Sequence, residues 1–230
     1  MQQRLGVSKF NKSWAASLGL VAAAALLVAA LSTGSAQAPA GGGGQAPPPP
    51  PTAGAHLDII DGSSASYKVT EQFVGIDFPN DAVGTTNAVS GSIIIGKDSA
   101  IDPSSKLTVD LSKLASDQDM RDNFARTRVL DVKTYPDAVF VPTSVTGIPS
   151  MIPFTGQSGV KLTGNMTIHG TTKEVTFQGI VTYNRAGTLE GRAKTTFNWG
   201  TFGLTKPSIA RLMSVDDNIE LDIIFKLKRS

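Results

Sequence analysis

A hairpin pattern between residues 161 and 183 constrains the fold of this chain more than any other stretch of the sequence. Apolar and polar residues alternate there with a period of two, and the alternation breaks at residues 169–172, which read HGTT. The apolar phase contains Leu162, Gly164, Met166, Ile168, Val175, Phe177, Gly179, Val181 and Tyr183. Such alternation is typical of antiparallel strands that bury one face, and a short glycine-containing turn joins two of them. The sequence therefore predicts a β-hairpin.

Six further segments are strand candidates, so that eight candidates lie between residues 66 and 228; most of them alternate, and residues 138–147 are apolar on both faces. The further segments are residues 66–78, 88–95, 106–111, 138–147, 188–199 and 219–228. Pro142, in the fourth strand of the series, indicates an edge or a bulge because proline lacks a backbone N–H. Eight alternating strands fit an antiparallel barrel or a sandwich. We expect an all-β, eight-stranded antiparallel barrel, because closure removes exposed sheet edges and leaves an interior for side chains or one small ligand.

One helical stretch, residues 116–128, lies between the third strand and the fourth. Ser116 suits an N-cap, and Asp117 and Asp119 suit the positive end of the helix dipole. Met120 and Phe124 lie four residues apart and give the helix a narrow apolar face. Because this helix is short, we expect it to cover the β-structure as a plug or lid.

Glycines recur on the apolar phase of the predicted strands, at Gly91, Gly164, Gly179 and Gly191. A missing side chain leaves space inside a barrel, or it marks a bend or a close approach between two backbones. The sequence leaves both interpretations open and does not by itself establish a cavity.

Residues 1–40 have the pattern of a secretory signal peptide. A basic segment precedes an almost wholly apolar run at 15–31, and small residues with Ala-x-Ala spacing follow. The run approaches the ~18 residues that span a membrane, so an uncleaved anchor is the alternative. Residues 41–56, rich in Gly and Pro, are predicted to be a disordered linker before a barrel domain at 57–230. We therefore expect an extracytoplasmic protein, by default periplasmic, with an inner-membrane anchored or a secreted form as alternatives.

The charge of the chain gives no sign of a nucleic-acid surface. Arg4, Lys9 and Lys12 belong to the leader, so the rest of the sequence carries 18 basic and 19 acidic residues. Cysteine is absent, which excludes disulfides, thiol catalysis and cysteine-based metal sites.

No constellation of residues in the sequence indicates catalysis. Of the two histidines, His56 lies before the predicted domain and His169 lies at the hairpin turn. The acidic residues Asp117, Asp119 and Asp122 lack the glycine and the distal glutamate of a calcium loop. We therefore predict no enzymatic activity, no catalytic residue, no metal and no cofactor.

Ordered motifs across residues 66–228 resemble the YceI-like family, exported bacterial proteins with a lipocalin-like barrel that bind polyisoprenoid and related lipids. The matching segments are residues 89–93, Arg121-Asp122 with Arg126, Tyr135-Pro136 with Phe140, residues 164–173, residues 202–204 and residues 217–221. The chain departs from the usual family pattern at Phe124, Val129-Leu130, Trp199 and Thr201, where the family often has His, Phe-Phe, Arg and an acid. These changes remove polar groups, so the head group of the ligand does not carry over.

The resemblance implies a binding protein that sequesters or carries an isoprenoid quinone or prenyl phosphate in the barrel. We expect the tail to contact Phe73, Val109, Met120, Phe124, Leu130, Met166, Ile168, Phe177, Phe197, Leu221, Ile223 and Phe225. Arg121, Arg126 and His169 are the candidates for head-group contacts. The expected partners are an apolar lipid and a membrane surface, which the protein contacts transiently or through an uncleaved N-terminal anchor. A homodimer is a further possibility, and no nucleic-acid partner is expected.

Two other functions compete with lipid binding. A structural or stress-protective module would have a barrel filled by its own side chains. An enzyme acting on a lipid would need His169 beside a carboxylate. Arg121 has a structural alternative as well, namely an ion pair with Asp122 that fastens the helix to the barrel.

Overall fold

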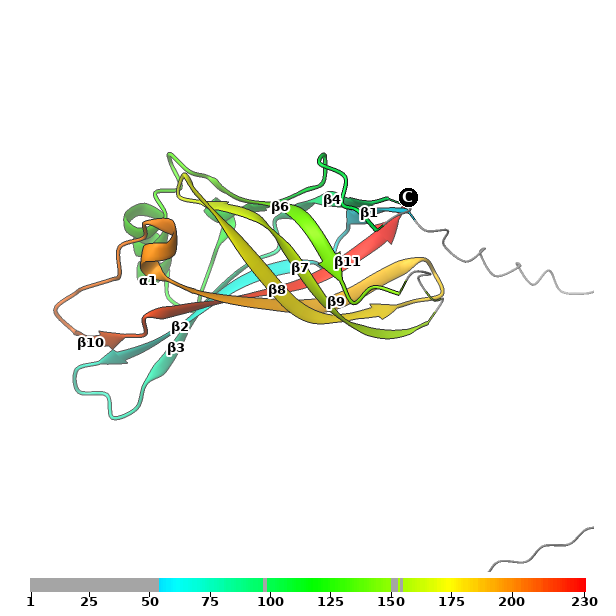
Figure 1. Ribbon diagram of the computed structural model, residues 1–230. Coiled ribbons are helices and arrows are strands. Elements are labelled where there is room, and N and C mark those ends of the chain that lie inside the picture. Colours follow the sequence, from blue (N-terminus) through cyan, green and yellow to red (C-terminus); the bar gives the residue numbers. More distant parts are fainter. Residues whose placement is uncertain (1–53, 97–98, 150–152, 154) are drawn as a thin grey trace, which may run out of the picture. The chain divides into compact units, whose positions relative to one another are not determined.

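A closed β-barrel dominates the part of the chain that the computed structural model describes, residues 54–96, 99–149, 153 and 155–230 (Figure 1). Its wall follows the order β1-β4-β5-β6-β7-β8-β9-β11, and pairing of β1 with β11 closes the ring. The strands are β1 Ala55–Ile59, β2 Ser64–Phe73, β3 Asn80–Thr86, β4 Val89–Ile95, β5 Lys106–Asp110, β6 Asp137–Thr146, β7 Gly156–Ile168, β8 Thr171–Tyr183, β9 Thr188–Asn198, β10 Leu212–Val215 and β11 Asn218–Arg229. The eight-stranded antiparallel barrel is confirmed. The predicted leader, and the linker up to residue 53, lie outside the described residues.

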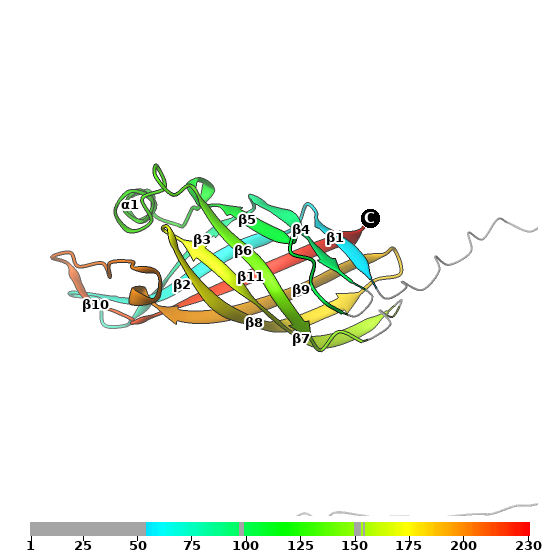
Figure 2. The ribbon, with the colours of Figure 1, turned by 45° about the horizontal axis from the view of Figure 1, so that its top comes forward.

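Two interrupted strands, together with the short β10 that pairs with the end of β2, reconcile an eight-stranded barrel with the eleven strands found in the described residues. β1 pairs with residues 227–229 of β11, and β2 continues along the same edge against residues 220–224. Buried Ser63 bridges the interruption, because its hydroxyl accepts a hydrogen bond from Lys226 N at 2.9 Å and donates one to Ile60 O at 2.9 Å. β3 and β4 form the matching interrupted strand, paired with β2 and β1 respectively. Figure 2 shows that the strands of the wall run obliquely around the barrel.

The predicted helix lies between β5 and β6, as expected, but it is shorter and partly π-helical. α1 spans Asp119–Phe124 and continues as the π-helical segment η2, Ala125–Val129. Ser116 does not cap it. Instead, the buried carboxylate of Asp122 accepts a hydrogen bond from Ser116 N at 2.8 Å, and Arg126 donates one to Leu114 O at 2.6 Å. These bonds tie the helix to the loop that precedes it.

Three strands were not predicted: β1, β3 and β10. β3 has the sequence NDAVGTT, which is typical of a loop, and it becomes a strand through pairing with β2 from Glu71 opposite Asn80 to Ala65 opposite Thr86. β1 includes His56, which the sequence analysis assigned to the linker. β2 correspondingly ends at Phe73 rather than at residue 78. Partners distant in the sequence decide all of these assignments.

The apolar interior divides into two packed groups along the barrel. The group on the α1 side includes edge-to-face ring pairs, Phe140 with Phe177 at 5.4 Å and Phe197 with Phe202 at 4.8 Å between centroids. The second group, around Leu57 of β1, closes the opposite part of the barrel. The bulge predicted at Pro142 is confirmed as a register shift between β6 and β7.

Candidate functional site

An apolar cavity of about 290 Å³ lies inside the barrel. It lies near the lower end of the roughly 300–1,000 Å³ typical of small-ligand pockets. The inward-facing residues of β11 line it in sequence: Ile219, Leu221, Ile223, Phe225 and Leu227. On the β1 side it reaches Leu57 and Ile95, and on the α1 side it reaches Phe124 and Leu204. The cavity therefore extends along both groups of the core.

Polar groups in the lining gather near α1. Tyr67 and Glu71 lie on the inward phase of β2, and Arg121 comes from α1. Arg121 Nη2 donates to Glu71 Oε1 at 2.8 Å, and Arg121 also pairs with the exposed Asp117. The side chains of Arg121 and Glu71 are only 18% and 12% exposed. One end of an otherwise apolar cavity therefore holds a compensated pair of charges.

The environment of this polar end shifts two pKa values. Burial raises the pKa of the Tyr67 hydroxyl, an effect that the nearby Arg121 partly opposes. Burial also disfavours the charge on Arg121, but hydrogen bonds to Glu71 and Asp117 outweigh it and raise the pKa of the guanidinium. At neutral pH, Tyr67 is thus a neutral hydroxyl beside a permanently charged arginine. Within the described ranges its hydroxyl makes no hydrogen bond, and Tyr67 lines the cavity.

Most of the predicted tail contacts lie in the lining. The structure places ten there: Val109, Phe124, Leu130, Met166, Ile168, Phe177, Phe197, Leu221, Ile223 and Phe225. Phe73 does not line the cavity, because β2 extends past the barrel and pairs Phe73 with Leu212 of β10. Met120 is 86% exposed, because α1 turns Arg121 and Phe124 inward and leaves Met120 facing solvent. The predicted lid over the barrel is therefore formed without Met120.

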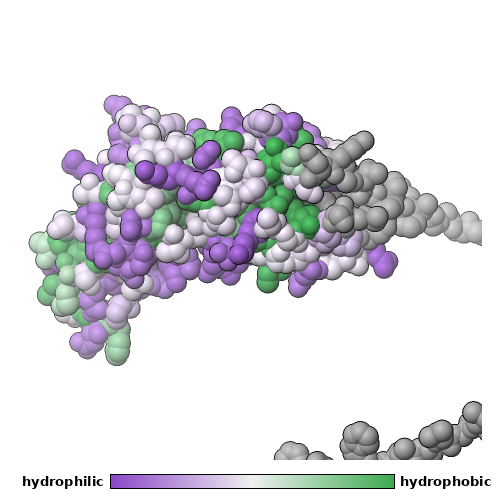
Figure 3. All heavy atoms as spheres, viewed as in Figure 1, coloured by the Kyte–Doolittle hydropathy of each residue, from purple (hydrophilic) through white to green (hydrophobic). Residues whose placement is uncertain are grey.

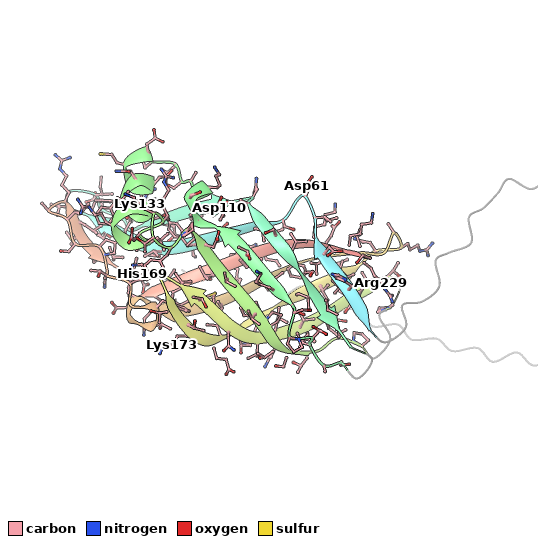
Figure 4. All side chains as sticks on the ribbon, turned by 90° about the horizontal axis from the view of Figure 1, so that it is seen from above. Asp61, Asp110, Lys133, His169, Lys173 and Arg229 are labelled. Carbon is pink, nitrogen blue, oxygen red and sulfur yellow. The ribbon has the colours of Figure 1, made fainter. Side chains whose placement is uncertain are left out.

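Of the three head-group candidates, the structure places Arg121 alone in the lining. Arg126 is engaged with Leu114 O. His169 lies at the tip of the β7–β8 hairpin, as Figure 4 shows, and its ring packs edge-on against Tyr135 with centroids 4.8 Å apart. The suggested ion pair between Arg121 and Asp122 is wrong, because adjacent residues on a helix point in different directions and Glu71 of β2 is the partner.

The sequence analysis missed Tyr67 and Glu71 as site residues. The signal was present, because Tyr67, Val69 and Glu71 share the inward phase of β2. A charged residue on an apolar phase marks either a paired charge or a functional position. Of the positions that depart from the family pattern, Phe124, Val129-Leu130 and Trp199 line the cavity and Thr201 does not. Phe124 and Trp199 stand where the family often has His and Arg, so they make the wall more apolar.

The glycines on the apolar phase do not line the cavity. A Cβ atom on Gly164 would lie 2.4 Å from Val141 O, and one on Gly191 would lie 2.2 Å from Ile180 O and 2.4 Å from the Phe225 ring. These glycines therefore permit close approach between strands, and the rings of Phe140 and Phe225 pack against Gly164 and Gly191 respectively. Of the two interpretations left open by the sequence, the structure supports close approach.

Neither a metal cluster nor a spanning helix occurs in the described residues. No group of three or more His, Asp or Glu side chains gathers there in a way that could hold a metal ion. Likewise, no helix in those ranges has the length and apolar character needed to cross a membrane.

Comparison with known proteins identifies related chains. The model of the YceI-like domain matches residues 60–227. A UPF0312 protein of Pseudomonas putida is 37% identical over 134 residues, which are 54% of this chain and 65% of that protein. A second UPF0312 protein, from Pseudomonas fluorescens, is 36% identical over 135 residues. The matched stretch thus spans slightly less than two thirds of these relatives.

Solved structures with similar folds have low sequence identity. A polyisoprenoid binding domain from Saccharophagus degradans, implicated in plant cell wall breakdown, has a TM-score of 0.59 at 12% identity and covers 76% of this chain and 99% of that chain. BcnA of Burkholderia cenocepacia has a TM-score of 0.50 at 17% identity and covers 70% of this chain and 95% of that chain. At these identities the similarity concerns the fold.

Proposed function

The chain belongs to the YceI-like family, and on that premise we propose that it binds an isoprenoid-type lipid inside its barrel. The apolar tail extends along the cavity, and the head group lies beside Tyr67 and Arg121. We further propose that the protein is extracytoplasmic and acts by sequestering or carrying its ligand, without a resident cofactor or metal. The solved relative named as a polyisoprenoid binding domain supports the class of ligand.

The cavity carries this proposal. Side chains do not fill the barrel, and the unfilled space is lined by aliphatic and aromatic residues except near Tyr67, Glu71 and Arg121. Burial of apolar surface contributes ~25 cal/mol per Å², or ~0.8 kcal/mol per methylene group. A long prenyl tail therefore gains much by leaving water, although ordering its flexible chain offsets part of that gain. A barrel packed solid, as a purely structural module requires, would not leave this space.

The position of His169 does not support the enzymatic alternative. The enzymatic alternative requires His169 beside a carboxylate, and His169 packs against Tyr135 outside the lining. The proposal therefore includes no chemical step.

Native mass spectrometry of the purified chain, with organic extraction of co-purifying molecules, tests the proposal. We expect a bound species with the mass of a prenyl lipid. Ala193→Trp would fill the middle of the cavity and abolish binding, because Ala193 is buried and faces inward from β9. Thr196→Trp, exposed on the same strand, is the matched control. Circular dichroism checks that both variants fold.

Two results would overturn lipid binding. One is a ligand-free mass that does not change when prenyl lipids are added. The other is equal lipid uptake by a folded Ala193→Trp variant and by the unsubstituted chain, which would place the lipid outside the cavity.

A further inference from the structure

Large apolar side chains are exposed where β2, β3 and β10 extend past the rest of the barrel. We call this set the apolar tip; its members are Val74, Ile76, Phe78, Ile209 and Met213. Phe78 is 79% exposed and Met213 is 63% exposed. Figure 3 shows apolar side chains gathered at this end of the molecule, over the β2–β3 turn and β10. Contiguous exposed apolar surface of this kind usually marks an interaction site.

The backbone of the apolar tip is ordered by its own hydrogen bonds. Val74 N donates to Arg211 O at 2.9 Å, which joins the β2–β3 turn to the loop before β10. β10 itself pairs with the last residues of β2, from Val215 opposite Glu71 to Leu212 opposite Phe73. The two loops therefore form one unit that projects at the end of the barrel (Figure 1).

The apolar tip adjoins the polar end of the cavity. Glu71, Pro207 and Val215 line the cavity. Along the chain, Glu71 precedes Val74 by three residues, Pro207 precedes Ile209 by two, and Val215 follows Met213 by two. A lipid that enters beside Glu71 and Arg121 consequently passes next to the tip.

We propose that the apolar tip docks on a lipid bilayer and inserts its side chains among the acyl chains, so that ligand passes between bilayer and cavity without crossing water. This proposal rests on lipid binding in the cavity, because a prenyl lipid resides in a bilayer. A convex projection with aromatic and branched side chains at its end suits insertion into a fluid surface. The charges beside it are mixed, since Arg211 and Asp77 are both exposed. Apolar burial, rather than attraction to anionic lipid, therefore drives docking.

A single-cysteine label tests docking in the full chain. Because the chain contains no cysteine, Phe78→Cys provides one site for a polarity-sensitive fluorophore. Ile180→Cys is the matched control, because Ile180 is 56% exposed on the wall strand β8. Vesicles of phosphatidylcholine, with and without phosphatidylglycerol, are added to each labelled protein. We expect a blue shift and a several-fold rise in emission at residue 78, quenching by acyl-chain quenchers, and no change at residue 180.

The fluorophore reports only on the surroundings of residue 78. Binding of the protein to vesicles through its N-terminal segment alone therefore does not produce the expected change in emission. Unchanged emission at residue 78 would overturn docking. A shift that grows with protein concentration in the absence of vesicles would overturn it in favour of contact between two copies of the chain. Native mass spectrometry with detergent-dispersed prenyl lipid tests cavity binding separately. If the protein takes up prenyl lipid but residue 78 does not insert into vesicles, only the docking proposal is overturned. If residue 78 inserts but the protein takes up no prenyl lipid, only the proposed function is overturned.

Transfer kinetics give a second test. Ile76→Asp combined with Phe78→Asp should slow prenyl lipid uptake from vesicles by on the order of tenfold, the factor that corresponds to ~1.4 kcal/mol. Uptake from a detergent dispersion should stay unchanged. Ile180→Asp is the control substitution, and equal rates of uptake from vesicles in all three proteins would contradict the proposal.

Discussion

At the scale of single residues, the pair formed by Glu71 and Arg121 distinguishes this barrel from a purely apolar container. Two charges that are largely removed from water are stable together, whereas either one alone is penalised. Asp117 provides a second, exposed partner for Arg121. The pair therefore fastens α1 to β2 and also places a fixed positive charge at the polar end of the cavity.

Arg121→Ala should lower the free energy of unfolding by about 1–3 kcal/mol, because Glu71 is left without its partner. Glu71→Gln keeps the arginine charge but weakens the pair. If Arg121 also contacts the head group, Glu71→Gln should preserve or raise affinity for a prenyl phosphate, while Arg121→Ala lowers it. Urea unfolding and lipid titration measure the two effects. Equal affinities in all three proteins would leave Arg121 with a structural role only.

Asp222 on the outer wall should make stability depend on acid pH. Arg192 donates hydrogen bonds to its carboxylate, at 2.7 Å and 2.8 Å from Nε, and these bonds hold the pKa of Asp222 below its usual value of 3.8. A lowered folded-state pKa stabilises the fold above the unfolded-state pKa, and this contribution is lost as the pH falls through the folded value. Asp222→Asn should therefore cost up to about 1 kcal/mol at pH 7 and progressively less below about pH 4. Urea unfolding at both pH values measures the difference, and a cost that does not vary with pH would contradict the assignment.

At the scale of elements, close strand contacts limit which residues the wall accepts. Gly164 of β7 lies opposite Pro142, at the bulge of β6. A Cβ atom there would lie 2.6 Å from Pro142 Cα, which is part of a backbone that cannot easily move. The curvature of this part of the wall therefore depends on glycine.

Gly164→Ala should lower the free energy of unfolding by about 1–3 kcal/mol through overpacking. Gly159→Ala in the same strand is the matched control, because a Cβ atom there would meet nothing within 4 Å. We expect the control to be neutral or stabilising by up to about 1 kcal/mol. Thermal and urea unfolding of both variants provide the comparison, and similar losses at both sites would indicate a general intolerance of β7.

At the scale of the whole molecule, β1 closes the barrel. Its five residues bridge β4 and β11, and Leu57 is 3% exposed between them. Without β1, the facing edges of β4 and β11 would expose unpaired backbone groups, which favours aggregation. The second group of the core would also lose Ala55 and Leu57.

A chain that begins at Ile60, where the family match also begins, should be destabilised by at least about 3 kcal/mol relative to one that begins at Gln45. Burial of a leucine side chain contributes ~1.5–3 kcal/mol, and the strand adds hydrogen bonds on both sides. Unfolding and gel filtration measure the stability and the aggregation of the two chains. Equal stability would show that the β1–β11 pairing does not support closure.

The sequence by itself determined most of the barrel wall and part of the cavity lining. Period-two alternation in residues 161–183 and 219–228 fixes which side chains face inward, and an inward phase of a closed barrel is necessarily the lining. For this reason Met166, Phe177 and Ile223, which the sequence analysis placed on the inward phase, line the cavity.

Only the tertiary structure decided which residues meet. β3 is a strand because β2 supplies its hydrogen bonds, not because NDAVGTT favours one. Glu71, the largely buried partner of Arg121, is fifty residues distant in sequence, so no local pattern could reveal it. Met120 and Phe73 failed as lining residues because the orientation of α1 and the reach of β2 past the barrel depend on packing. Periodicity records which face of a strand is buried, whereas the distances between strands and helices exist only in the folded chain.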